Sequence, residues 1–136
     1  MPEREPKEEA AILARKAQGD AAAMRMLADD QEIDDEIIGF HAQQAVEKWL
    51  KAVIGSRGAK FEYTHDLRHL IELAKAAVGD FPFDFAAVIA LTEYAVPLRY
   101  DELLDAEPLD REATVALVQK VGRWAAAQLK APDDVQ

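Results

Sequence analysis

The chain has 136 residues and a formal charge of −10, with 26 acidic against 16 basic side chains. Half of the residues are hydrophobic and only six are Gly and six Pro, which indicates one folded domain with its own core. There is no Cys, so disulfides and thiolate metal sites are excluded. A chain this acidic repels nucleic acid as a whole, although binding remains possible wherever basic residues cluster. The charged N-terminus has no apolar stretch behind it and no run is long enough to span a membrane, so we expect a cytoplasmic protein.

Apolar residues recur at helical spacing along the chain, and no stretch shows the sustained period of two that a strand requires. The predicted helices span about 7–29, 34–54, 64–79, 81–95 and 110–129. Gly19 with Asp20 is expected to bend the first helix, and Pro97 to kink or end the fourth. Five helices with short connections predict an all-α fold, an antiparallel up-and-down bundle of four to five helices. We expect a single domain over residues 1–136 with its core at about 8–130.

The second predicted helix has two distinct faces. Its apolar face consists of Ile38, Ala42, Ala45, Trp49 and Val53. Its polar stripe consists of His41, Gln44, Lys48 and Lys51, with Glu47 beside it. These side chains are donors for an anion or for a buried polar partner. The plainer interpretation is a polar face that stabilises itself through local charge pairs.

The last predicted helix is apolar on two faces. One face carries Val115, Val118, Gly122, Ala125 and Leu129, and the other carries Leu117, Val121, Trp124 and Gln128. A helix too apolar for one interface is either central in its own bundle or shared with a second subunit.

Two groups of residues outside these faces are candidates for chemistry. His65 and His69 have the spacing of two metal ligands on a helix, but no Glu follows His65 as in the zinc protease motif and Arg68 would lie beside the ion. We therefore predict no metal site and no cofactor. Arg99 and Tyr100 follow the expected helix break, where a guanidinium binds phosphate while the ring stacks on a base. The alternative is that Arg99 pairs with the acids next to it.

Three segments, in this order and spacing, resemble those of HEPN domains, a name that stands for higher eukaryotes and prokaryotes nucleotide-binding. The segments are Gln43-Gln44-Ala45-Val46-Glu47-Lys48 with Lys51-Ala52, then His65-Asp66-Leu67 with Leu70, then Tyr94 with Leu98-Arg99-Tyr100. The likeness covers about residues 8–130. It implies a bundle of four or five helices and a homodimer.

The resemblance also implies three activities. Many HEPN proteins are metal-independent ribonucleases, often toxins, that use an Arg followed four to six residues later by a His across a dimer. Small prokaryotic members are paired with minimal nucleotidyltransferases in toxin–antitoxin operons, and others are non-catalytic nucleotide or partner modules. Arg99 matches the family's arginine, but positions 104–106 are Leu104, Asp105 and Ala106, and no His occurs after His69. A carboxylate does not supply the pKa of an imidazole without strong perturbation.

The preferred hypothesis is a non-catalytic or degenerate HEPN protein that binds a nucleotide or other phosphate-bearing ligand, a minimal nucleotidyltransferase partner, or both. The predicted ligand-binding residues are His41, Gln44, Glu47, Lys48, Lys51, His65, Asp66, Arg99 and Tyr100. The first alternative is a ribonuclease that uses Arg99 with His41 or His65 as a relocated histidine. The second is a purely structural helical dimer.

Overall fold

The computed structural model describes residues 5–61, 64–95 and 107–130. Its elements are α1 (Pro6–Ala28), α2 (Asp35–Ser56), α3 (Leu67–Val78), α4 (Phe85–Ile89), the 3₁₀ helix η1 (Ala90–Tyr94) and α6 (Arg111–Lys130). These residues contain no strand, so the all-α prediction is confirmed. None of the described helices combines the length and the hydropathy that crossing a membrane requires.

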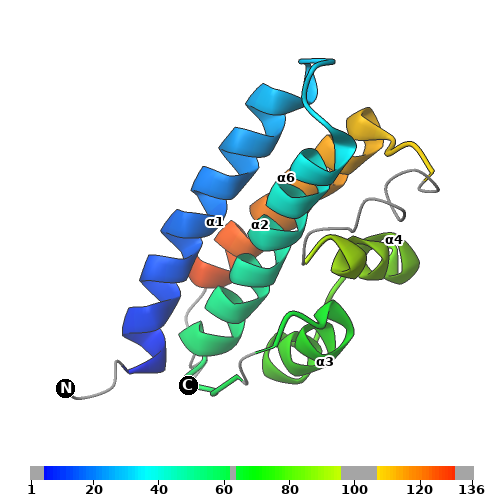
Figure 1. The fold of residues 1–136 in the computed structure, drawn as a ribbon. Coiled ribbons are helices and arrows are strands. Elements are labelled where there is room, and N and C mark those ends of the chain that lie inside the picture. The colour runs from blue at the N-terminus through cyan, green and yellow to red at the C-terminus, as the bar shows by residue number, and fades with distance from the viewer. Residues whose placement is uncertain (1–4, 62–63, 96–106, 131–136) are drawn as a thin grey trace.

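Helix α2 lies at the centre of the bundle. It packs along α1, against α6, and against the pair formed by α3 and η1 (Figure 1). Its predicted apolar face is confirmed, since all five residues of that face are buried. Polar side chains are buried on it as well, namely Gln43, Glu47 and Lys51.

The two apolar stripes of α6 are both used inside one chain. Val118, Val121 and Ala125 are buried, and Val115 and Leu117 pack against the same core. The ring of Trp124 makes edge-to-face contacts with Phe81 at 5.3 Å and with Phe83 at 6.0 Å between ring centroids. Contacts within this chain therefore account for both apolar stripes of α6, and its apolar width is no argument for a second subunit.

The predicted start of the fourth helix was wrong for a local reason, whereas the bounds predicted for the third helix, a start at 64–66 and an end at Gly79, are confirmed. The fourth helix begins at Phe85 and not at Phe81, because the carboxylate of Asp84 accepts a hydrogen bond from the Ala87 N–H and fixes the start there. The third helix begins at Leu67, after its cap Asp66, and ends at Gly79 in the left-handed conformation with φ of 83°.

Helix α1 is unbroken, and the bend expected at Gly19 and Asp20 stays a prediction. It continues from Pro6 to Ala28 without an interruption at Gly19. The expected break at Pro97 lies outside the described residues.

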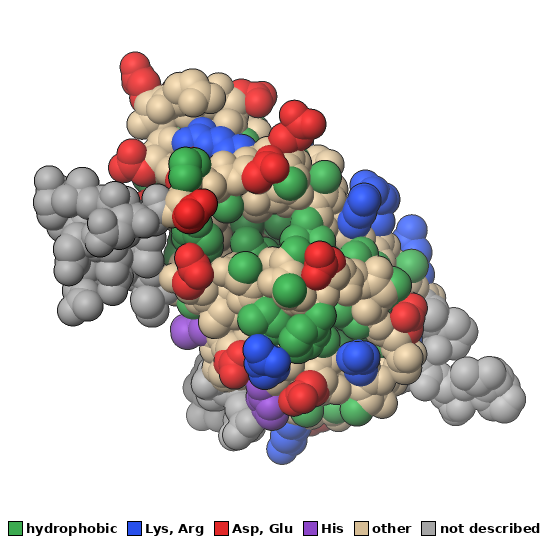
Figure 2. All heavy atoms as spheres, turned by 90° about the vertical axis from the view of Figure 1, so that its right-hand side faces the viewer, with side chains coloured by type: hydrophobic (Ala, Val, Ile, Leu, Met, Phe, Trp, Pro, Cys, Tyr) green, Lys and Arg blue, Asp and Glu red, His purple; other side chains and the backbone are tan. Residues whose placement is uncertain are grey.

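The face formed by α3 and α4 mixes apolar and charged side chains (Figure 2). Hydrophobic groups gather there in patches bordered by Lys, Arg, Asp and Glu. The guanidinium of Arg68 lies 5.2 Å from the ring centroid of Phe85, which is 39% exposed. Such a contact over a half-exposed ring contributes only about 0.5–1 kcal/mol.

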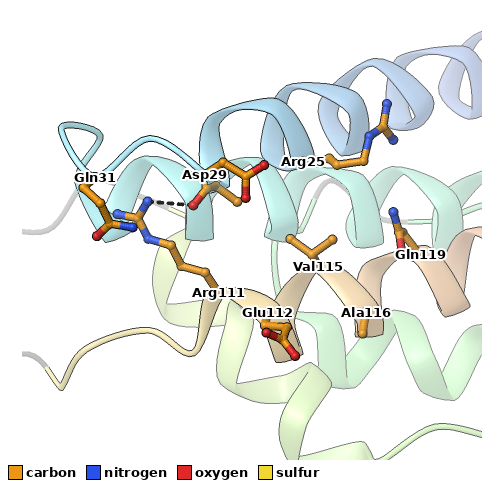
Figure 3. Close-up of a pocket in the computed structure, with 9 residues that line it drawn as sticks. Arg25, Asp29, Gln31, Arg111, Glu112, Val115, Ala116 and Gln119 are labelled. Atoms are coloured by element: carbon orange, nitrogen blue, oxygen red, sulfur yellow. Dashed lines mark hydrogen bonds between the residues drawn. The ribbon is translucent and has the colours of Figure 1, made fainter.

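Arg111, the first residue of α6, fastens this helix to the turn between α1 and α2. Its Nη1 donates to the carbonyl of Ala28 at 3.1 Å (Figure 3). The same Nη1 donates to the carbonyl of Asp30 at 3.0 Å, and its Nε donates to Asp35 Oδ1 at 2.9 Å. Its Nη2 donates to the carbonyl of Ile33. The guanidinium thus pairs the Ala28 carbonyl at the end of α1, which the helix itself leaves unpaired, and two carbonyls of the turn that follows.

We expect Arg111→Met to lower the free energy of unfolding by about 2 kcal/mol, because charge-assisted hydrogen bonds are lost while the aliphatic stem is kept. Urea denaturation followed by circular dichroism measures the change. Lys120→Met, an exposed position on the same helix, is the control and is expected to change stability little. Equal effects of the two substitutions would contradict the role given to Arg111.

Two glycines provide a matched pair for a packing test. A Cβ at Gly122 would lie 2.5 Å from the Trp49 ring, whereas a Cβ at Gly19 would meet nothing within 4 Å. We expect Gly122→Ala to destabilise the fold by about 1–3 kcal/mol through overpacking, and Gly19→Ala to stabilise it by about 0.5–1 kcal/mol through helix propensity. Melting temperatures of the two variants that moved in the same direction would contradict the packing of α6 on α2.

Candidate functional site

The first cluster on the polar face of α2 is centred on Asp20 of α1. His41 Nδ1 lies 3.1 Å from Asp20 Oδ1, and Lys48 Nζ donates to Asp20 Oδ2 at 2.5 Å. All three side chains are partly buried. This carboxylate therefore joins two side chains of α2 to α1 and pairs with the ammonium of Lys48.

The second cluster is centred on the buried carboxylate of Glu47, which is 4% exposed. Its Oε1 accepts from Gln43 Nε2 at 2.8 Å and lies 2.8 Å from His65 Nδ1. Its Oε2 accepts from Lys51 Nζ at 2.9 Å. Because three donors from two elements converge on it, Glu47 is a structural centre and presents no free oxygen to a ligand.

The pKa of Glu47 is lowered from its ordinary value of 4.5. Burial acts in the opposite direction and raises the pKa, but the hydrogen bonds from His65, Gln43 and Lys51 and the charge of Lys51 outweigh it. The carboxylate is therefore ionised near neutral pH and can only accept hydrogen bonds.

Because an ionised Glu47 can only accept a hydrogen bond, the Nδ1 of His65 that faces it carries a proton. The opposite edge of the ring, with Nε2, points outward. The His65 side chain is 59% exposed. In the neutral ring the outward Nε2 is an acceptor, and in the protonated ring it is a donor. Next to it, Lys51 Nζ also lies 5.6 Å from the ring centroid of Phe61. The cluster thus exposes one edge of the His65 ring in a fixed orientation. The charge of the Glu47 carboxylate behind it is balanced by Lys51.

The predicted site residues are divided between these clusters. His41 and Lys48 face Asp20, whereas Lys51, Glu47 and His65 lie together, so the polar stripe of α2 divides into two internally paired groups. Gln44 donates to the side chain of Gln43, which extends the second group.

The remaining predicted residues do not join either cluster in the described part of the chain. Asp66 is the cap of α3, since its Oδ1 accepts from the Arg68 N–H at 3.0 Å. Arg99 and Tyr100 lie outside the described residues. That Arg99 and Tyr100 bind a ligand together with the residues of these clusters therefore stays a prediction.

Sequence reasoning missed two side chains that organise these clusters. Gln43 is buried and precedes Glu47 by one helical turn, so its position in the Gln43-Gln44 pair was the available signal. Asp20 had no such signal, because its partners lie 21 and 28 residues away in the sequence. Within the described residues, no three His, Cys, Asp or Glu side chains are grouped so as to hold a metal ion.

The fold and the clusters define an all-helical domain whose central helix carries a buried Glu47–Lys51 ion pair, which the exposed ring of His65 joins from the segment before α3. The HEPN domain family model matches residues 10–129, and the chain belongs to this family. Searches of curated proteins and of solved structures gave no significant match.

We expect Glu47→Gln to cost about 3 kcal/mol of unfolding free energy, since it leaves the buried ammonium of Lys51 without its counter-charge. The lowered pKa of Glu47 also predicts stability that is present above pH 4.5 and is lost as pH falls through the folded-state value. Urea unfolding between pH 3 and pH 7 measures both effects. If wild type and Glu47→Gln lost stability in parallel over the acid range, the Glu47 contribution would be absent.

Proposed function

We propose that this chain is a non-catalytic or degenerate HEPN-domain protein that binds a phosphate-bearing ligand, a nucleotide or RNA, at the surface around His65. One observation carries the proposal: Glu47 holds Nδ1 of His65 at 2.8 Å, while the His65 side chain is 59% exposed. An imidazole whose orientation is fixed in advance loses little conformational entropy when it binds an anion.

The pairing within α2 narrows the set of ligand contacts. His41 and Lys48 already share Asp20, and Lys51 is paired with Glu47, so these side chains are less available to an external phosphate. We therefore place the ligand at His65, with Arg99 and Tyr100 as the further contacts that the sequence supplies.

The absence of turnover follows from the sequence after Arg99. The family's ribonuclease pattern requires a His four to six residues later, and this chain has none there. Membership of the family supports four further parts of the proposal. They are a minimal nucleotidyltransferase partner, a toxin–antitoxin role, a homodimer and a cytoplasmic location.

The ribonuclease alternative is favoured by the same contact. A histidine oriented through Nδ1 by a carboxylate, with Nε2 free, has the arrangement of a general acid or base. If this chain cleaves RNA, His65 is the relocated histidine and Glu47 its positioning residue. His41, which is 27% exposed and paired with Asp20, is the weaker candidate.

We expect inorganic phosphate and AMP to raise the melting temperature of wild type, because a ligand that binds only the folded state stabilises it by about 2.7 kcal/mol at 100 times its Kd. His65→Ala and Arg99→Ala are expected to lose this response. Lys75→Ala, an exposed change on α3, is the control and is expected to keep it. Retention of the full response by His65→Ala would place the ligand elsewhere.

The same proteins decide between binding and turnover. We expect no cleavage of a mixed RNA pool in EDTA by wild type, judged against Arg99→Ala purified identically. Cleavage by wild type that both Arg99→Ala and His65→Ala abolish would establish the ribonuclease alternative and overturn the non-catalytic proposal.

A further inference from the structure

A cavity opens where the end of α1, the turn that follows it and the first turns of α6 meet (Figure 3). Its volume of about 460 Å³ is within the range of roughly 300–1,000 Å³ that small-molecule sites occupy. None of its lining residues belongs to the clusters around Asp20 and Glu47. The surface around His65 therefore does not account for this cavity.

Several polar side chains of the cavity wall have no partner in the chain. Within the described residues, no hydrogen bond or ion pair engages the side chains of Arg25, Asp29, Gln31, Glu112 and Gln119. Arg111 also lines the cavity, but its guanidinium is already paired with Asp35 and with backbone carbonyls. The charged groups left for a ligand are thus one guanidinium and two carboxylates.

These charged groups are separated along the cavity. Because α1 ends here and α6 begins here, Asp29 and Glu112 lie toward the same end of the cavity (Figure 3). Arg25 precedes Asp29 by four residues, about 6 Å along α1, and lies with Gln119 toward the other end. The cavity therefore has an acidic end and an end with a guanidinium and an amide.

Apolar groups form the surface between the two ends. They belong to Ala28, Val115 and Ala116. In Figure 3, Val115 lies between Asp29 and Gln119. An aliphatic chain with a charge at each end covers such a surface and keeps both charges beside polar groups.

The position of Asp29 is not explained by the helix that precedes it. Asp29 caps the C-terminus of α1, where a carboxylate faces the negative end of the helix dipole. Glu112 differs, since it lies in the first turn of α6, where the dipole favours a carboxylate. A cation bound in the cavity relieves the repulsion at Asp29, so this carboxylate supports a positively charged ligand.

We propose that the cavity binds a basic amino acid with a free α-carboxylate, L-arginine or L-lysine, alone or as the last residue of a peptide. Arg25 pairs with the α-carboxylate, and the side-chain cation lies between Asp29 and Glu112. The aliphatic part of the ligand covers the apolar surface. Free arginine carries two positive charges and one negative charge, which complement the two carboxylates and the one guanidinium of the wall.

Two other classes of ligand fit this wall less well. A phosphate would lie beside Asp29 and Glu112, and like charges at short range repel each other. A metal ion needs more ligands than these two carboxylates, and the described residues contain no group of three His, Cys, Asp or Glu side chains suited to hold one. The proposal is therefore independent of phosphate binding at His65, and either one can fail without the other.

The test is a titration of the isotope-labelled full chain with L-arginine, followed by heteronuclear NMR. We expect saturable shifts of the backbone amides of residues 25–31 and 111–119. L-Citrulline lacks the side-chain charge and agmatine lacks the carboxylate. Each is expected to bind about three- to tenfold more weakly, because it loses one charged contact in an open cavity.

Glu112→Gln and Arg25→Met are expected to weaken the binding of L-arginine by a similar factor. The matched controls, Glu72→Gln and Lys75→Met, make the same charge changes at exposed positions of α3 and are expected to bind like wild type. The spectrum of each variant also shows whether it is folded.

Three results would overturn the proposal: shifts centred on another surface, equal binding of L-arginine, L-citrulline and agmatine, or equal weakening by the α3 controls. The peptide acetyl-Gly-Gly-Arg distinguishes the two sources of the ligand. Tighter binding than that of free arginine assigns the cavity to a peptide C-terminus, and weaker binding assigns it to the free amino acid.

Discussion

The arrangement of the central helix depends on one buried carboxylate. Glu47 lies on α2, where water cannot stabilise its charge, and an unpaired ion in such a place costs several kcal/mol. Gln43 and Lys51 compensate part of that cost from α2 itself, and His65 adds its contact only if the chain preceding α3 returns to α2. Satisfying the carboxylate therefore also selects the path of the connection after α2 and the orientation of the His65 ring.

Much of the bundle was predictable because helix periodicity and capping are local properties. The apolar face of α2 follows from residue spacing alone, and Gly79 ended its helix where the sequence indicated. The start of α6 at Asp110 was equally predictable, and the Asp110 carboxylate accepts a hydrogen bond from the Ala113 N–H there at 3.0 Å. Each of these features involves residues within a few positions of one another.

The parts that could not be predicted depend on distant partners. A histidine and a lysine on a helix surface look available until Asp20, from another helix, is placed between them. The fourth helix was overestimated for a related reason, since Phe81 and Phe83 favour contact with Trp124, 41 or more residues later, over a helical start. The candidate site was thus predicted in its residue types, while the division of the stripe into two paired groups required the fold.

Pairing also organises the charge of the whole molecule. Lys48 and Lys51 of α2 are paired with acids of the same chain, whereas exposed cations of α1 and α6 such as Arg25 and Arg123 form no ion pair within the described residues. Counting charges along a sequence cannot reveal which cations are paired. Only the geometry of the fold distinguishes an ammonium in an ion pair from one exposed to solvent.

The hydrogen bonds from Arg111 of α6 to the turn after α1 have a consequence for the order in which the molecule folds. Its partners on the turn after α1 are separated from it by 76 to 83 residues, so this contact closes a long stretch of chain and forms late on entropic grounds. During synthesis the N-terminal helices emerge first. Until α6 arrives, the Trp49 ring, which lies against Gly122 in the finished fold, has no cover from that helix. The newly synthesised hairpin of α1 and α2 then exposes apolar surface. The time until α6 packs on it sets how long neighbouring chains or chaperones can bind this surface.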